Sequence, residues 1–159
     1  MVYSMAAIKQ FGTPDPALTY GDRTGAYGLL ARDGKLACVR IGYGPYEYDF
    51  PGGAVDPGET PRQAVVREFG EETGLLVEVG QPITDLKHYF IHEDGTPYNN
   101  HAHFFEITLL GEKPEAKCEA DHELVWLGPL EVITHLKNEG YAWALVAWLR
   151  RWSKAADAG

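Results

Sequence analysis

The segment from residue 53 to residue 75, GAVDPGETPRQAVVREFGEETGL, constrains the fold more than any other part of the chain. A stretch rich in turn-forming residues leads into a pattern that is typical of an α-helix. Thr60 is a favourable N-cap residue, Pro61 suits the first helical position, and Gly74 suits the position just past the end. The sequence therefore predicts a glycine-containing loop followed by a helix from about Pro61 to Thr73.

Three glutamates gather on one side of this predicted helix. Because an α-helix turns by about 100° per residue, Glu72 lies about 40° from Glu68 in one direction and Glu71 about 60° in the other. Val65 and Phe69 fall on a separate apolar face that can pack on a core. Neighbouring carboxylates repel one another unless a cation lies between them, and Mg²⁺ and Mn²⁺ are the simplest partners with oxygen ligands. The pattern alone is compatible with a metal site on the acidic face, and a solvated face is the more usual explanation for such residues.

The same segment resembles the Nudix box, Gly-x5-Glu-x7-Arg-Glu-U-x-Glu-Glu-x-Gly-U, in which U is a bulky apolar residue. The fixed positions are met in order by Gly53, Glu59, Arg67, Glu68, Phe69, Glu71, Glu72, Gly74 and Leu75. The resemblance implies an α/β fold, a Nudix-type α/β/α sandwich with a mixed central sheet. It also implies a hydrolase that uses Mg²⁺ or Mn²⁺ to cleave the pyrophosphate bond of a nucleoside diphosphate linked to another moiety.

The resemblance further implies roles for individual residues. The three helix glutamates correspond to the metal-binding carboxylates of the family, and the carbonyl of Gly52 often completes the metal shell. Arg67 and Glu59 correspond to residues that hold the loop and the helix together and orient these ligands. The metal ions would then lie between the carboxylates and the oxygens of a pyrophosphate.

A hydrolase of this type often uses a further acid from a loop opposite the helix, as a metal ligand or as the general base. The predicted loop at residues 111–123 offers four such side chains, Glu115, Glu119, Asp121 and Glu123. A solvated acidic loop is the alternative explanation for each of them. We favour Glu119 and Glu123, because they border the last predicted strand and would return toward the edge of the sheet.

The approach to the box is rich in aromatic residues. Tyr46 and Tyr48 are candidates to stack on a nucleobase, and packing in the core of a strand is the alternative. Many family members carry a tryptophan at the position of Asp49. Because this chain departs from that pattern, the resemblance does not specify the nucleobase of the substrate. The resemblance to the box implies binding of a pyrophosphate, but it gives no information about the groups at the two ends of that pyrophosphate. We lean to a nucleoside triphosphate, because the chain is short and has no obvious dimerisation domain.

Two alternatives to a hydrolase remain open. A Nudix-like module could sense a nucleotide without cleaving it, and an enzyme of the same fold could isomerise a diphosphate ester. Degenerate modules usually lose some of the carboxylates, whereas this chain keeps every box position. The sequence therefore favours an enzyme that acts on the acid anhydride of a phosphorus-containing compound.

Composition limits the compartment and the partners. The chain has 159 residues, which suits a single domain over 1–159, and its two cysteines cannot form a disulfide framework. The start lacks a convincing signal peptide, so we expect a cytoplasmic protein. A net charge of −9 makes the chain a poor binder of nucleic-acid polymers and anionic membranes. We expect a small nucleotide-type substrate, with bound metal ions supplying the positive charge.

The rest of the pattern predicts a mixed sheet covered by helices. Strands are expected at residues 26–32, 36–41, 76–79, 85–92, 101–110 and 123–127. Asp33-Gly34 is a hairpin turn signal between the first two. Two further helices are expected at residues 130–137 and 141–156. The second is apolar nearly all round, which predicts a buried covering helix, with a homodimer face as the alternative.

The six histidines raise the question of a zinc site. His101 and His103 alternate on a predicted strand and so point to one face, and His88 and His92 do the same on another strand. No cysteine accompanies them at zinc-finger spacing. We therefore expect ordinary cleft or surface histidines.

Overall fold

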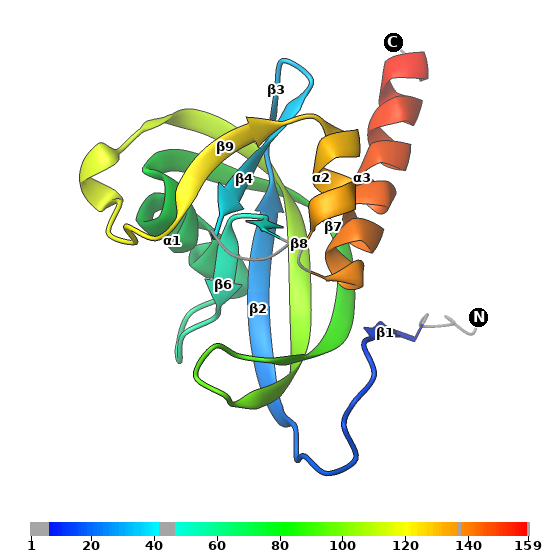
Figure 1. Ribbon diagram of the computed structural model, residues 1–159. Coiled ribbons are helices and arrows are strands. Elements are labelled where there is room, and N and C mark those ends of the chain that lie inside the picture. The colour runs from blue at the N-terminus through cyan, green and yellow to red at the C-terminus, as the bar shows by residue number, and fades with distance from the viewer. Residues whose placement is uncertain (1–6, 42–46, 137, 159) are drawn as a thin grey trace.

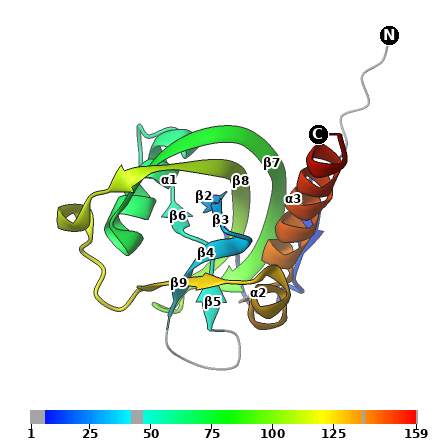
Figure 2. The same cartoon turned by 90° about the horizontal axis from the view of Figure 1, so that it is seen from above.

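The computed structural model describes residues 7–41, 47–136 and 138–158. Two β-sheets occupy its centre (Figure 1). Seen from above, α1 (Pro61–Thr73) lies on one side of the sheets, and α2 (Pro129–His135) and α3 (Glu139–Ala158) lie on the other side (Figure 2). The predicted α/β/α sandwich is confirmed.

The larger sheet mixes parallel and antiparallel pairs. Its strands are β1 (Lys9–Phe11), β2 (Gly21–Leu29), β6 (Gly52–Ala54), β7 (Leu75–Ile91) and β8 (Pro97–Glu112). They lie in the order β1-β7-β8-β2-β6, and β1–β7 and β2–β8 are the parallel pairs. The smaller sheet is antiparallel and contains β3 (Ala31–Arg32), β4 (Lys35–Arg40), β5 (Tyr48–Asp49) and β9 (Glu123–Leu127). The predicted mixed sheet is therefore confirmed as well.

The ends of α1 follow the predicted signals. The Thr60 hydroxyl accepts a hydrogen bond from the N–H of Gln63 at 3.2 Å, and the Gln63 side chain accepts one from the N–H of Thr60 at 2.9 Å. These two bonds form a capping box. At the other end Gly74 is left-handed, with φ of 72°. Val65 and Phe69 on the apolar face are fully buried against the sheets.

The first predicted strand, 26–32, is divided between the two sheets. β2 ends at Leu29, and β3 begins at Ala31 in the smaller sheet. Leu30 is buried at the break. The hairpin turn is where it was expected, because Asp33 and Gly34 join β3 to β4 with positive φ angles of 53° and 75°. The sequence pattern thus locates the turn but not the change of sheet.

The predicted strands 76–79 and 85–92 are wrong as separate elements. They form one strand, β7, in which the register against β8 shifts between Val79 and Pro82 and again between Pro82 and Thr84. Proline has no N–H to donate to the ladder, and a β-bulge accommodates it without ending the strand. The long β7–β8 pair is the result, and β8 likewise extends beyond the predicted 101–110.

The last helix covers the face of the larger sheet that is opposite α1. Tyr141, Leu145 and Trp148 are buried and pack in one apolar cluster with Leu86 of β7 and Phe104 of β8. This agrees with the predicted covering helix, and a homodimer stays a prediction.

One side of α3 is nevertheless partly open. Trp143 is 45% exposed, and its ring lies 6.1 Å from that of Phe11 and 5.1 Å from the Lys9 ammonium. The aromatic ring therefore helps to hold β1 at the sheet edge. Among the helices that the structure describes, none is long and apolar enough to cross a membrane.

Candidate functional site

Two glycines allow the carboxylates of α1 to lie against the backbone of β6. The N–H of Gly52 donates a hydrogen bond to Oε1 of Glu72 at 2.8 Å. A side chain at Gly52 would meet the carbonyl oxygen of Ala26 at 2.2 Å, and a Cβ at Gly53 would lie 2.8 Å from Oε1 of Glu68. The position of Gly52 therefore requires glycine for close approach to the backbone, whereas a larger residue at the position of Gly53 would displace the carboxylate of Glu68.

Arg67 joins the loop to the helix, as the resemblance implied. Its guanidinium holds both oxygens of Glu59, with Nε 2.8 Å from Oε2 and Nη2 2.9 Å from Oε1. Nη1 also donates to Oε1 of Glu68 at 2.9 Å and to Oε2 of Glu71 at 3.1 Å, and Nη2 donates to the carbonyl of Ala54 at 3.0 Å. One cation thus fixes three carboxylates, and it lowers the pKa of Glu59 through these hydrogen bonds.

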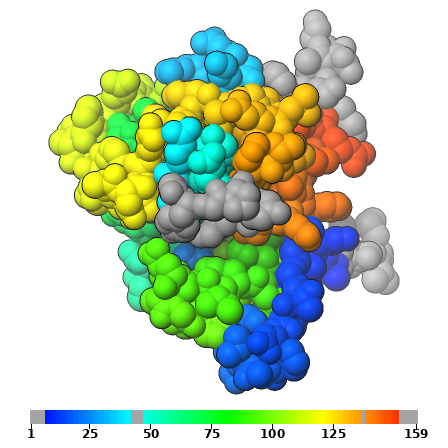
Figure 3. Space-filling model, viewed as in Figure 1, coloured from blue at the N-terminus to red at the C-terminus, as the bar shows by residue number. Residues whose placement is uncertain are grey.

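The segment at 113–122 folds over the C-terminal end of α1. The N–H groups of Cys118 and Glu119 both donate to the carbonyl of Glu71, at 3.0 and 3.1 Å. The ammonium of Lys117 donates to the carbonyls of Glu72 and His122, at 3.0 and 2.7 Å. These donors satisfy carbonyls that the end of a helix leaves without partners inside the helix. In the space-filling view this yellow segment lies over α1, so that little of the helix is visible from that side (Figure 3).

The fold of this segment brings Glu119 to the helix glutamates. Among the described residues, Glu68, Glu71 and Glu119 place one ligand atom each within 4.8 Å of one another, and so do Glu72, Glu119 and His122. His122 lies between two carboxylates, with Nε2 3.2 Å from Oε2 of Glu72 and Nδ1 3.2 Å from Oε2 of Glu119. The two groups share Glu119 and form one acidic site.

Burial and mutual repulsion raise the proton affinity of this site. Burial raises the pKa of Glu72 well above its usual range, against the opposing hydrogen bond from Gly52. Burial also raises the pKa of Glu68, where Arg67 opposes the shift and Glu119 adds to it. The side chain of Glu72 is only 5% exposed. Crowded, desolvated carboxylate oxygens fit Mg²⁺ or Mn²⁺, because a dication offsets both the burial and the repulsion.

The other predicted site residues are placed differently. Glu123 is 66% exposed on β9, and its carboxylate lies 3.4 Å from Nη1 of Arg40. The alternation of side chains along a strand turns it away from Glu119 and the helix. Tyr48 is 5% exposed and its hydroxyl accepts a hydrogen bond from Arg40 at 3.4 Å. A ring this buried has no free face for a base, so Tyr48 belongs to the core; Tyr46 lies outside the described residues.

Sequence reasoning missed His122 and Lys117. Both stand in the loop that was singled out for its acids, and no spacing rule connects either of them with the box. Their position beside the favoured Glu119 was the available signal. Their contacts depend on how the loop closes over the helix, which a linear pattern does not specify.

Comparisons with known proteins agree with the geometry. A family model described as "NUDIX domain" matches residues 19–149. An uncharacterized Nudix hydrolase of Rhodococcus erythropolis is 33% identical over 102 residues, which are 62% of this chain and 55% of the relative. An RNA pyrophosphohydrolase of Pseudoalteromonas translucida is 38% identical over 71 residues, 40% of this chain and 41% of the relative. The chain therefore spans about half the length of the curated relatives it matches.

The fold is similar to that of solved structures at lower sequence identity. A NUDIX hydrolase from Nitrosomonas europaea superposes with a TM-score of 0.64 at 18% identity, covering 82% of this chain and 90% of that one. At this identity the likeness concerns the fold.

Proposed function

The chain belongs to the Nudix family, and from this premise we propose that it is a divalent-metal-dependent hydrolase. The reaction is cleavage of the pyrophosphate bond of a nucleoside diphosphate linked to another moiety, and a nucleoside triphosphate is the first substrate to test. The observation that carries the proposal is the convergence of the buried Glu68 and Glu72 with the partly exposed Glu119 in one acidic site. A non-catalytic sensor has no need for two desolvated carboxylates, Glu68 and Glu72, whose burial destabilises the fold.

Each residue of the site has a part in this proposal. Glu68, Glu71 and Glu72, with the carbonyl of Gly52, would hold Mg²⁺ or Mn²⁺. Such ions, when bound, stabilise the charge of the phosphates and lower the pKa of a water. Arg67 keeps the carboxylates of the helix in position through its contacts at 2.9 and 3.1 Å.

Glu119 is the candidate general base. It is the one acid from the 111–123 loop that reaches the helix glutamates among the described residues. Its Oε2 lies 3.2 Å from Nδ1 of His122, which also contacts Asp121 at 3.1 Å, and Nε2 of the same ring lies 3.2 Å from Oε2 of Glu72. A carboxylate held there can accept a proton from an attacking water at Oε1 or Oε2. His122 is therefore a positioning residue in this scheme.

Substitution of Glu72 by Gln tests the proposal directly. Removing one ligand charge should lower turnover in excess Mg²⁺ by at least about 100-fold, because several kcal/mol of charge stabilisation is lost. Glu93→Gln is the matched control, since Glu93 is exposed in the β7–β8 turn and should leave the rate unchanged. Turnover of the Glu72→Gln variant within a few-fold of the parent would defeat the assignment.

The substrate is tested with a panel of compounds. Nucleoside triphosphates, dinucleoside polyphosphates, ADP-ribose, NADH and an RNA with a 5′-triphosphate are incubated with the protein, and the phosphate and nucleotide products are measured. The RNA is included because a relative carries the name RNA pyrophosphohydrolase. If the protein cleaves the RNA fastest, the RNA replaces the small nucleotide as the proposed substrate. No product from any compound would favour the sensor or the diphosphate-ester isomerase.

A further inference from the structure

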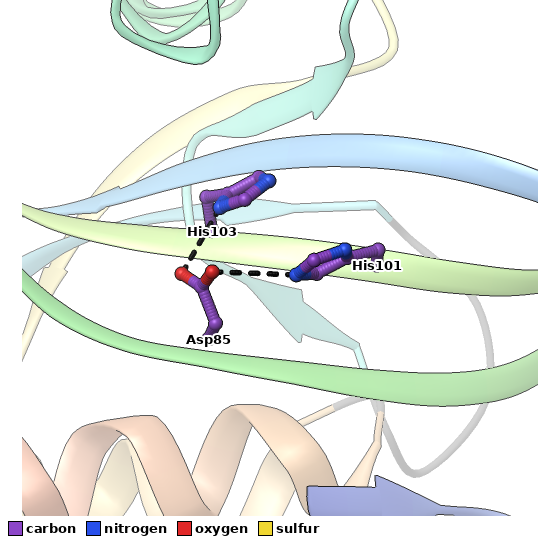
Figure 4. Close-up of side chains that lie close together, drawn as sticks. All are labelled: Asp85, His101 and His103. Atoms are coloured by element: carbon purple, nitrogen blue, oxygen red, sulfur yellow. Dashed lines mark hydrogen bonds and ion pairs between the residues drawn. The ribbon is translucent and has the colours of Figure 1, made fainter. Parts of the chain in front are cut away.

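A second group of metal-ligating side chains lies on the β7–β8 pair. Asp85 of β7 and His103 of β8 are directly opposite in the antiparallel register. His101 precedes His103 by two residues on the same strand, so the two rings project from the same face. Figure 4 shows that both rings approach the Asp85 carboxylate from the neighbouring strand. The predicted common face of the two histidines is confirmed, and the structure adds an acid that the sequence did not connect with them.

The distances suit a shared cation. Nε2 of His101 lies 3.3 Å from Oδ2 of Asp85, and Nδ1 of His103 lies 3.0 Å from Oδ1. One ligand atom from each residue falls within 4.8 Å of the other two. In a tetrahedral zinc site with bonds of about 2.0 Å, ligand atoms are about 3.3 Å apart. The two contacts use different oxygens of Asp85, so a shared ion requires ligand atoms that lie within 4.8 Å of one another to close in by up to about 1.5 Å.

The donor set differs from that of the acidic site. Of the metal-competent groups found among the described residues, this is the one with two imidazoles and a single carboxylate. Imidazole nitrogen favours Zn²⁺ and its neighbours in the first transition row, whereas Mg²⁺ favours oxygen. Three protein ligands leave the fourth position of a zinc ion to water. The donor atoms of this group therefore favour a transition-metal ion such as Zn²⁺, whereas the acidic site would favour Mg²⁺.

The group is accessible and separate from the acidic site. The side chains of Asp85, His101 and His103 are 41%, 30% and 22% exposed, so an ion can enter from solvent. In the sheet, His103 is paired with Ala26, which is paired with Gly53. Two strand spacings separate His103 from Gly53, or about 10 Å. The ligands also stand on paired strands rather than on a loop, which pre-organises them.

From this geometry we propose that Asp85, His101 and His103 form a second metal site, which binds a first-row transition-metal ion, Zn²⁺ in the first instance. The ion ties β7 to β8 at the centre of the larger sheet. Without an ion the same three residues form one hydrogen bond, between His101 and Asp85, and one close contact between His103 and Asp85, and the experiment separates the two states. The proposal concerns binding and does not rest on the proposed hydrolysis.

Calorimetric titration with Zn²⁺ in the presence of millimolar Mg²⁺ tests the proposal. Mg²⁺ competes for the oxygen ligands of the acidic site and leaves the imidazoles of His101 and His103 to bind Zn²⁺. One Zn²⁺ should bind per chain, and nitrogen-detected NMR should show large shifts at Nε2 of His101 and Nδ1 of His103. Affinity should follow the order Cu²⁺, then Zn²⁺, then Co²⁺.

Variants assign the binding to these residues. His103→Ala and Asp85→Asn should each weaken Zn²⁺ binding by at least about 10-fold, since loss of a direct ligand should cost no less than loss of a supporting residue. His92→Ala is the matched control, because His92 pairs with Asp94 at 3.1 Å and no third ligand joins them within the part of the chain that the structure describes, and it should leave the affinity unchanged. Glu72→Gln should also keep the Zn²⁺ site.

The result that overturns the proposal is equally specific. If His101→Ala and His103→Ala bind Zn²⁺ as tightly as the parent does, the ion lies elsewhere. The same conclusion follows if Glu72→Gln abolishes Zn²⁺ binding. Unfolding curves in EDTA show whether each variant is folded, and His101→Ala at the more exposed position is the fallback if His103→Ala is not. The two proposals are tested by different measurements in Glu72→Gln. Loss of hydrolysis bears on the proposed function, and retained Zn²⁺ binding bears on the second metal site.

Discussion

At the scale of single residues, one arginine organises the acidic site. Arg67 contacts Glu59, Glu68 and Glu71 at distances between 2.8 and 3.1 Å. A planar guanidinium can bind one carboxylate with two nitrogens and still offer a third to its neighbours, which a lysine ammonium cannot do in the same geometry. The resemblance implied this role for Arg67 and Glu59, and their contacts agree with it.

Replacing Arg67 by Lys should lower stability. The ammonium cannot reproduce the paired bonds to Glu59, so the free energy of unfolding should fall by about 2 kcal/mol. Urea unfolding measures the change. Arg151→Lys is the control, because Arg151 is exposed and meets Glu106 at 3.4 Å, and it should cost less than about 0.5 kcal/mol. Equal losses in the two variants would contradict the role given to Arg67.

The two cysteines should differ in reactivity. Burial raises the pKa of Cys38 to about 12, with smaller contributions from the carboxylates of Asp49 and Glu131, whereas Cys118 is exposed. The thiolate is the reactive form, so Cys38 stays protonated and unreactive at neutral and mildly alkaline pH. Native protein treated with iodoacetamide should carry one label, on Cys118, by mass spectrometry. Unfolded protein should carry two, and rapid native labelling of Cys38 would refute the burial argument.

At the scale of elements, the site depends on a loop, a helix and a returning segment. The loop and helix α1 were predicted from caps and spacing, and both ends of the helix are confirmed. A charged loop was predicted over residues 111–122; β8 extends to Glu112, and the position of the remaining segment at 113–122 is set by donors that satisfy the last carbonyls of α1. The backbone therefore delivers Glu119 to the site, while β9 carries Glu123 away from it.

Gly53→Ala should damage the site and spare the fold. Its methyl group would lie 2.8 Å from Oε1 of Glu68, which must then move. Misplacing a functional carboxylate by about 1 Å can lower the rate on the order of 100-fold. Steady-state kinetics over a range of Mg²⁺ concentrations measures this effect. Gly111→Ala is the control, because a Cβ there meets no atom within 4 Å, and its rate should equal that of the parent.

At the scale of the whole molecule, two apolar clusters hold three layers together. One joins α1 to the sheets and the other joins α2 and α3 to the opposite side. The continuous β7–β8 pair lies between them and carries residues of both clusters on its two faces. This arrangement explains why Ala102 and Phe104 face α3 while His101 and His103 face the other way. A homodimer through the exposed part of α3 stays a prediction.

Leu145→Ala should show how much the covering helix contributes. The side chain of Leu145 in α3 is fully buried where the helix packs on the sheet. A cavity there should lower the free energy of unfolding by about 3 kcal/mol. Leu130→Ala is the control, since Leu130 is 84% exposed and should change stability by less than about 0.5 kcal/mol. Chemical denaturation followed by circular dichroism measures both. A loss below 1 kcal/mol for Leu145→Ala would mean that α3 is held mainly by other contacts.

Interactions between residues that are close in sequence determine much of the acidic site. The caps of α1, the glycines of the approach and the spacing of Glu68, Glu71 and Glu72 act over a few residues, so the sequence determined the helix and its acidic face. Contacts between distant segments decided the remainder. Glu119 and His122 reach the site through the closure of a loop, and Asp85 meets His103 through a register that follows three shifts along β7. Such pairings depend on packing across the sheet, which no local spacing encodes.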